Sequence, residues 1–167
     1  MKRVFGGLAS LVVLIGLLVG IPAALVFFAG NPFPTGDELA RVISTEMGKP
    51  FAQAQGEVAL SASIYQWYAD HGESLLEEET LDVGDDAKSV VVTEPIGVLM
   101  GVMPWNFPQY QVARFAAPNL MLGNTVLLKH ASICARTGEL IEEILHAAGI
   151  PEDAYINLYL DTEDVPA

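Results

Sequence analysis

The sequence predicts an α/β protein: a partial Rossmann-like β-α-β-α-β half-fold preceded by helices, plus one N-terminal transmembrane helix. Three observations lead to this prediction. An uncharged run opens the chain, and apolar residues then recur with a helical period. After these helices, short β-branched or continuous apolar runs alternate with amphipathic segments. Such alternation is typical of parallel strands joined by right-handed crossover helices.

The opening segment predicts a membrane anchor. Residues 4–30 contain no charged side chain. As a helix they would measure about 40 Å, enough to cross a hydrocarbon core of about 30 Å, although Pro22 would bend or end it. We therefore expect a transmembrane anchor over residues 1–30, in contact with the membrane through residues 4–30, and a Pro- and Gly-containing linker over 31–36. A cleaved signal peptide and a buried core helix are the alternatives.

The charges divide unevenly along the chain. Residues 37–167 carry all 21 acidic side chains and six of the eight basic ones, a net charge of −15. This balance argues against sequence-independent binding of nucleic acid, which needs basic groups. The other two basic residues, Lys2 and Arg3, favour a cytoplasmic N-terminus under the positive-inside rule, and thus a membrane localisation with the body outside. The single cysteine, Cys134, and three scattered histidines predict no metal site.

Residues 37–88 are expected to form the helical N-terminal part of the domain. A helix over 37–47 has acidic residues in its first turn, where they complement the helix dipole. A longer helical pattern covers 51–79 and ends in a strongly acidic run over 73–86. We interpret that run as a solvated helix face, because it lacks the ligand spacing of an EF-hand calcium loop.

Residues 89–167 are expected to form a truncated half-fold of the nucleotide-binding kind. The continuous apolar run at 98–103 predicts a strand buried on both faces. The last strand would be an unpaired edge, so we expect marginal solubility for residues 37–167 alone. The predicted strands are 89–93, 98–103, 125–128 and 155–160, and the predicted helices are 110–122 and 133–148.

Two segments follow strands of the predicted sheet, where open α/β sheets bind their ligands. In the first, Pro104 and Pro108 stiffen the loop that carries Asn106. A side-chain amide held in this way is a preorganised donor for a developing oxyanion. In the second, Lys129 can reach hydroxyls or phosphates of a nucleotide. An ordinary turn asparagine and a surface lysine are the alternatives.

Several motifs carry a more specific signal than their spacing. They are Glu46-Met47-Gly48-Lys49-Pro50, Pro95-Ile96-Gly97-Val98, Met103-Pro104-Trp105-Asn106-Phe107-Pro108, Arg114-Phe115-Ala116-Ala117-Pro118-Asn119-Leu120 and Leu128-Lys129-His130-Ala131-Ser132. In order and interval they resemble the NAD(P)-dependent aldehyde dehydrogenase superfamily, and most of all its succinate-semialdehyde dehydrogenase branch. The resemblance covers residues 38–164 and makes the chain similar to an N-terminal fragment of that family. Residues 1–36 do not share it and look like a membrane segment from an unrelated protein.

The resemblance implies roles for four residues. Asn106 matches the asparagine whose amide stabilises the oxyanion of a thiohemiacetal intermediate. Trp105 matches a residue that lines the cofactor pocket, and Lys129 one that contacts the adenosine ribose or its 2′-phosphate. Ser132 stands where NAD-preferring members often carry a glutamate, which repels a 2′-phosphate, so NADP is favoured over NAD as the cofactor.

The resemblance also implies an activity that this sequence does not complete. The parent reaction is oxidation of an aldehyde, such as succinate semialdehyde, to the acid. The family is cytoplasmic, and a homo-oligomer is a possible assembly. The family's cysteine nucleophile and glutamate base have no match, and Cys134 stands at a non-catalytic position as a core cysteine. We therefore expect the chain to be inactive alone. A membrane-tethered, non-catalytic interaction module and a gene-fusion remnant are the alternatives.

Overall fold

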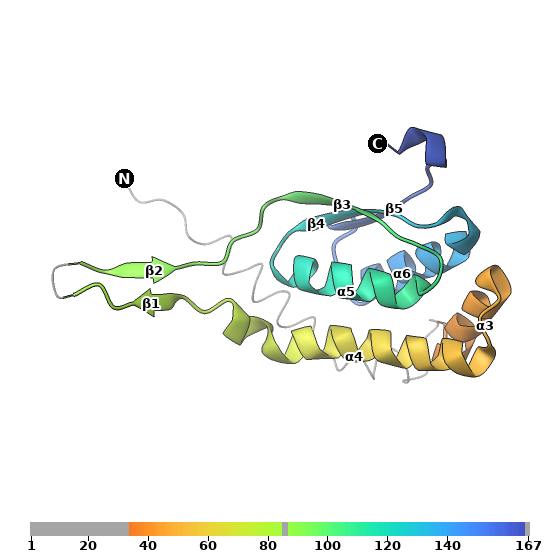
Figure 1. Cartoon of the computed structure of the whole chain (residues 1–167), viewed down its shortest axis with the longest axis horizontal. Coiled ribbons are helices and arrows are strands. Elements are labelled where there is room, and N and C mark those ends of the chain that lie inside the picture. Colours follow the sequence, from red (N-terminus) through yellow and green to blue (C-terminus); the bar gives the residue numbers. More distant parts are fainter. Residues whose placement is uncertain (1–33, 85–86, 166–167) are drawn as a thin grey trace.

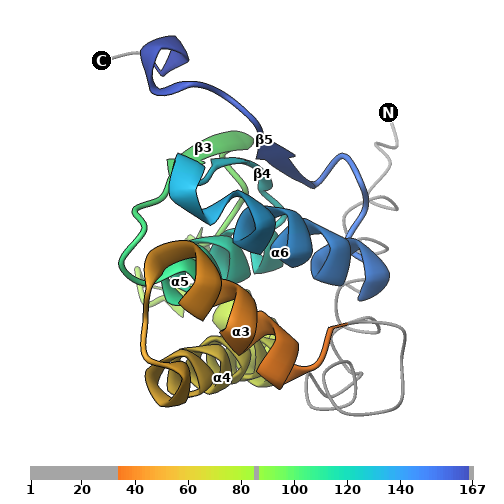
Figure 2. The same cartoon turned by 90° about the vertical axis from the view of Figure 1, so that its right-hand side faces the viewer.

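The computed structural model describes residues 34–84 and 87–165 of the chain. Figure 2 shows three layers in this part: a sheet, then α5 and α6, then α3 and α4. The elements are α3 (Gly36–Met47), α4 (Phe51–Leu75), β1 (Glu79–Leu81), β2 (Ser89–Val91), β3 (Val98–Val102), α5 (Pro108–Met121), β4 (Thr125–Lys129), η1 (Ser132–Cys134), α6 (Ala135–Ala147), β5 (Tyr155–Leu158) and η2 (Thr162–Asp164) (Figure 1).

The predicted β-α-β-α-β unit is confirmed. Strands β3, β4 and β5 form a parallel sheet in that order, with α5 joining β3 to β4 and α6 joining β4 to β5. Both helices lie on the same face of the sheet (Figure 2). The core between them and the sheet consists of Val112, Ala116, Leu120, Val126, Leu128, Ile141, Leu145 and Tyr155.

The layer of α3 and α4 packs on the far side of α5 and α6. Helix α3 begins one residue before the predicted start, because Thr35 and Glu38 form a capping box at the end of the predicted linker. Gly48 ends the helix with a φ of 76°, a left-handed conformation that favours glycine. The second core consists of Leu39, Ala40, Ile43, Ala54, Val58, Leu140 and Ile144.

The acidic run does not continue a helix as predicted. Helix α4 ends at Leu75, because acidic side chains are unfavourable beside the partial negative charge of a helix C-terminus. The chain then forms β1, which pairs antiparallel with β2 in a hairpin that projects from the body (Figure 1). The predicted strand at 89–93 therefore belongs to this hairpin and not to the parallel sheet. The predicted boundary between residues 37–88 and 89–167 falls inside the hairpin and stays a prediction.

Strand β3 is not buried on both faces as predicted. Val98, Met100 and Val102 are 68%, 44% and 54% exposed. In the described part of the chain, helices cover only the other face of the sheet (Figures 1 and 2). A second difference concerns the start of the helix predicted over 133–148. Helix α6 begins at Ala135, and Ile133 belongs to the short turn η1 that precedes it, where its side chain is exposed.

The membrane localisation predicted from the sequence is corrected by the structure. Within residues 34–84 and 87–165, no helix combines the length and the apolar character needed to cross a membrane. The transmembrane segment predicted over residues 4–30 lies outside the described residues.

Candidate active site

The two predicted site segments meet at one edge of the sheet. Residues 104–108, here named the β3–α5 loop, follow β3, and residues 129–132 follow the neighbouring parallel strand β4. His130 Nε2 lies 2.9 Å from the carbonyl oxygen of Pro108, so the two segments are in direct contact. The structure therefore brings the predicted residues together at the carboxyl ends of parallel strands, where α/β sheets bind ligands.

Asn106 is exposed within the β3–α5 loop, between the exposed rings of Trp105 and Phe107. Its backbone carbonyl oxygen accepts a hydrogen bond of 2.9 Å from Lys49 Nζ. Among the described residues its side-chain amide has no hydrogen-bond partner. The two amide N–H groups are thus free to donate to a ligand while the backbone behind them is held.

A buried ion pair supports this loop from the helical layer. Lys49 pairs with Glu57, and their side chains are 7% and 1% exposed. Glu57 Oε1 also accepts hydrogen bonds from the backbone N–H groups of Gln109 (2.8 Å) and Tyr110 (3.1 Å) in the first turn of α5. The N-cap residue of α5, Phe107, offers no side-chain acceptor, so a glutamate from α4 does the capping.

Helix α6 is capped in the same way by Glu46 from α3. Its carboxylate accepts from the backbone N–H groups of Arg136 (2.6 Å) and Thr137 (3.1 Å) and from the Thr137 hydroxyl (2.6 Å). Helix N-termini that follow strands are common phosphate sites in nucleotide-binding folds. Here carboxylates occupy both, so neither of these helix N-termini is open to a phosphate.

His130 is a structural residue of this edge. Its Nδ1 accepts from the backbone N–H of Ala131 at 2.8 Å, so Nε2 carries the proton and donates to the carbonyl of Pro108. Burial lowers the pKa of His130, which favours this neutral form. Both ring nitrogens are thus engaged by backbone groups, so His130 holds the loop together.

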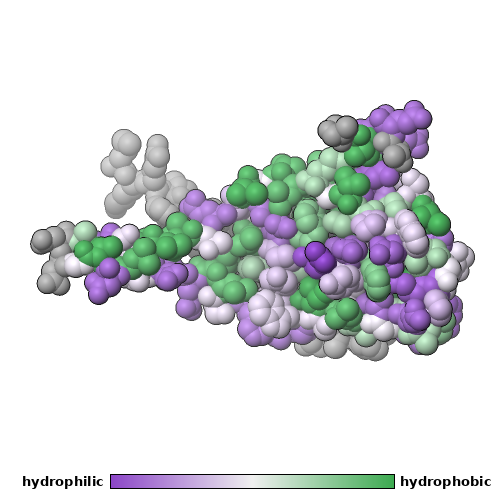
Figure 3. All heavy atoms as spheres, in the orientation of Figure 1, coloured by the Kyte–Doolittle hydropathy of each residue, from purple (hydrophilic) through white to green (hydrophobic). Residues whose placement is uncertain are grey.

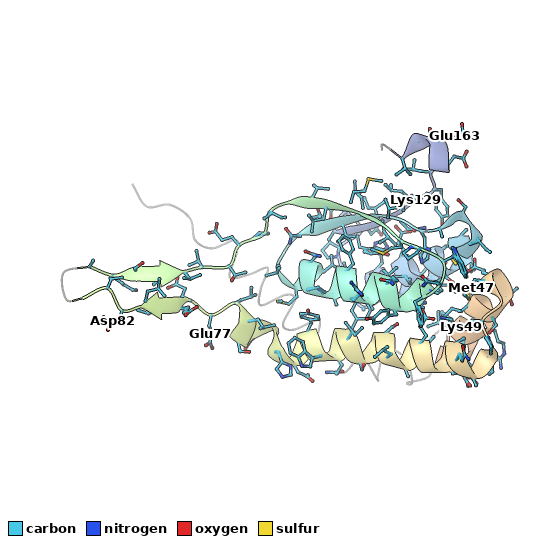
Figure 4. The ribbon with its side chains drawn as sticks, in the orientation of Figure 1. Met47, Lys49, Glu77, Asp82, Lys129 and Glu163 are labelled. Atoms are coloured by element: carbon cyan, nitrogen blue, oxygen red, sulfur yellow. The ribbon has the colours of Figure 1, made fainter. Side chains whose placement is uncertain are left out.

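Lys129 differs from the other buried charged residues of the site. Alternation along β4 places its side chain on the face away from α5 and α6, and its strand neighbours are Val102 and Leu158. Lys129 as a residue is 5% exposed, but its Nζ atom is not fully buried, and among residues 34–84 and 87–165 the ammonium group has no hydrogen-bond or ion-pair partner. The stem of the side chain is thus covered while its charged end reaches the surface with free donors, so the position is suited to a ligand that supplies acceptors. Figure 4 shows Lys129 above Lys49 at the same end of the molecule.

Cys134 is a core cysteine, as predicted. It is fully buried at the end of η1, and its Sγ lies 3.9 Å from the carbonyl oxygen of Trp105. Burial raises the pKa of the thiol to about 11. The thiolate that a nucleophile requires is therefore scarce at neutral pH.

Three charged residues of this site have roles that were not predicted from the sequence. Glu46 and Lys49 stand in one of the quoted motifs, whereas Glu57 stands in none of them. The signal for Glu57 was its place among small and apolar residues at helical spacing. The buried residues around it on α4 are Ala54, Val58 and Ser61.

Residues 34–165 match the aldehyde dehydrogenase family. This chain belongs to the aldehyde dehydrogenase family. Succinate-semialdehyde dehydrogenase [NADP(+)] of Deinococcus radiodurans is 50% identical over 129 residues, covering 77% of this chain and 27% of that protein. Succinate semialdehyde dehydrogenase [NAD(P)+] Sad of Escherichia coli is 42% identical over 129 residues, with 77% and 28% covered. The chain thus spans about a quarter of the length of these relatives.

Solved structures of aldehyde dehydrogenases show the same fold. The chain is similar to succinic semialdehyde dehydrogenase from Streptococcus pyogenes in complex with NADP+, with a TM-score of 0.76 and 31% identity over 98% of this chain and 38% of the other. For the succinate-semialdehyde dehydrogenase from Burkholderia pseudomallei the TM-score is 0.78 and the identity 31%, over 89% and 30%. The family resemblance of the sequence is thereby confirmed, and the α/β fold agrees with these structures.

Proposed function

We propose that this chain supplies one part of the active site of an NADP-dependent dehydrogenase that oxidises a small aldehyde of the succinate-semialdehyde class to its acid. That part is the oxyanion-stabilising amide and the adenosine side of the cofactor site. The observation that carries the proposal is the ammonium of Lys129, which has no partner among the described residues, at the sheet edge that also holds the exposed amide of Asn106. The names of the relatives from Deinococcus radiodurans and Streptococcus pyogenes support the substrate class and the cofactor.

The residues at this edge fit the adenosine half of NADP. Lys129 has three N–H donors for a ribose hydroxyl or a 2′-phosphate. Ser132 is exposed and uncharged, so it does not repel a 2′-phosphate, whereas a carboxylate there would exclude it and favour NAD. Trp105, 55% exposed, offers a flat apolar surface beside the same edge. When bound, the cofactor supplies the acceptor for the hydride that leaves the substrate.

Asn106 is proposed to act on the substrate. When a nucleophile adds to an aldehyde, negative charge develops on the carbonyl oxygen, and a preorganised N–H donor stabilises it. Asn106 has free amide protons on a loop whose backbone is held by a buried lysine. The nucleophile itself is not Cys134, which is buried and has a raised pKa. We therefore propose that the chain alone does not turn over aldehyde.

Binding of adenosine nucleotides to the full chain tests this function. Titration of the ¹⁵N-labelled protein with 2′,5′-ADP and with 5′-AMP should shift the backbone resonances of residues 129–132, with tighter binding of 2′,5′-ADP. Lys129→Met should weaken 2′,5′-ADP binding about tenfold or more, because a charge-assisted contact is lost. Lys88→Met, which removes an exposed lysine next to β2, is the matched control and should bind normally. Equal binding by the Lys129 and Lys88 variants would reject the assignment.

A further inference from the structure

We infer that Lys49 and Glu57 are positioning residues that set the geometry of the Asn106 amide, an inference that rests on the proposed function of Asn106. Neither side chain is expected to touch substrate or cofactor. They act through the backbone of the β3–α5 loop.

Lys49 contacts the β3–α5 loop directly. Its ammonium donates to the carbonyl oxygen of Asn106 at 2.9 Å and pairs with the carboxylate of Glu57. It also lies 3.8 Å from the centroid of the Phe107 ring. Lys49 therefore contacts the Asn106 backbone and the side chain that follows it. Holding that carbonyl fixes the peptide plane next to the Asn106 Cα, and so restricts the direction of the Cα–Cβ bond that carries the amide.

Glu57 connects Lys49 to the first turn of α5. One carboxylate oxygen pairs with Lys49, and the other accepts from Gln109 and Tyr110 in the first turn of α5. Since α5 begins directly after the β3–α5 loop, Glu57 ties the loop and the helix to one point. That point lies on α4, a helix of 25 residues. The exposed loop is thus fixed to a rigid element of another layer.

The two capping glutamates, Glu57 and Glu46, differ in their ion-pair partners. Glu46 caps α6 through three hydrogen bonds and has no lysine partner among the described residues. Capping alone therefore needs no ion pair. A buried ion pair is a weak source of stability, and apolar residues of similar volume often replace it at no cost. At α5 the capping glutamate has an additional partner, Lys49. Besides its pair with Glu57, Lys49 donates a hydrogen bond to the backbone carbonyl of Asn106, the candidate catalytic residue.

The test follows the side-chain NH₂ signal of Asn106 in the ¹⁵N-labelled full chain, assigned by its loss in Asn106→Asp. Lys49→Met keeps the length of the side chain but removes the donor. It should move the Asn106 signal and raise hydrogen exchange at Gln109 and Tyr110 about tenfold or more. Lys49→Arg, which keeps the charge and the donors, should restore both readouts towards wild type.

Glu46→Gln is the matched control for a merely structural effect. It should lower stability through α6 but leave the Asn106 signal in place. Should Lys49→Met fail to fold, Glu57→Gln, which keeps an acceptor for α5 but weakens the pair with Lys49, gives the same readout. The inference is overturned if the Asn106 signal in the Lys49 or Glu57 variant moves no further than in Glu46→Gln. Since no cofactor or turnover is needed, this outcome is independent of the nucleotide titration that tests the proposed function.

Discussion

Ser132 is exposed three residues after Lys129, whose ammonium has no partner among the described residues, and this pair is proposed to set the cofactor preference. A carboxylate at position 132 would repel a 2′-phosphate and accept hydrogen bonds from free ribose hydroxyls. Ser132→Glu should therefore reduce the preference of the full chain for 2′,5′-ADP over 5′-AMP about tenfold or more, as measured by NMR titration. Ser132→Gln has the same shape without the charge and should keep the preference. An unchanged preference in the Glu variant would remove Ser132 from the site.

His130 gives the chain a pH-dependent contribution to stability. Its pKa is lowered in the folded state, chiefly by burial, so the folded protein binds this proton less readily than the unfolded chain. The contribution is present above the unfolded pKa of about 6.5 and is lost as the pH falls through the folded value. Urea unfolding at pH 7.5 and pH 5 should show a smaller loss of stability in His130→Gln than in wild type. His71→Gln, at an exposed position, should retain the wild-type difference.

The thiol of Cys134 should be unreactive in the folded chain. Because the thiol is buried and its pKa is raised to about 11, a disulfide reagent at pH 8 should react only after unfolding. The full chain should likewise show no oxidation of succinate semialdehyde with NADP+. Turnover that disappears in Cys134→Ser would contradict both expectations.

Residue identities at this site were predictable to different degrees. Asn106 and Lys129 follow strands, which suggested a ligand site, and the family resemblance of their motifs suggested their roles. Lys49, Glu57 and Glu46 act on backbone groups about 50 to 90 residues away in sequence. Only the packing of α3 and α4 on α5 and α6 creates those contacts, and no local pattern encodes it.

Helix α5 and helix α6 each depend on a glutamate from another helix. Glu57→Gln and Glu46→Gln should each lower the free energy of unfolding by about 1–3 kcal/mol, since hydrogen bonds between a charged group and the first turn are weakened. Urea denaturation of the full chain measures this. Glu139→Gln removes a half-exposed partner of Arg136 on the surface of α6 and should cost about 0–1 kcal/mol. Equal losses in all three variants would argue against a special capping role.

At the scale of elements, periodicity predicted the helices and the parallel strands well, because amphipathic spacing reflects burial directly. The β1–β2 hairpin was harder to predict from the sequence. Strand β1 lies in an acidic run whose local composition suggested a solvated helix, and its strand conformation depends on pairing with β2. Exposure of β3 was also missed, because an apolar run indicates burial without showing which faces are covered.

The whole molecule exposes more apolar surface than its acidic composition suggests. Figure 3 shows hydrophobic atoms along the projecting hairpin and on the upper side of the body. The exposed large residues of these strands are Leu81, Val90, Val91, Val98, Met100 and Val102.

Exposed strand edges and apolar patches favour association. We expect residues 37–167 alone to self-associate in analytical ultracentrifugation, and Val98→Thr with Val102→Thr to reduce this. A monodisperse monomer with a sharp cooperative melt would contradict the expectation.

Turnover by a chimaeric enzyme decides whether this chain carries a working part of an aldehyde dehydrogenase site. In the chimaera, residues 34–165 replace the matching segment of the succinate-semialdehyde dehydrogenase of Deinococcus radiodurans, which is 50% identical over 129 residues. NADP+-dependent oxidation of succinate semialdehyde should persist. Asn106→Ala should lower kcat by about 10²–10³-fold through loss of the oxyanion donor, whereas exposed Gln53→Ala should not. A folded chimaera without turnover, or one whose kcat is unchanged by Asn106→Ala, would contradict the proposed function.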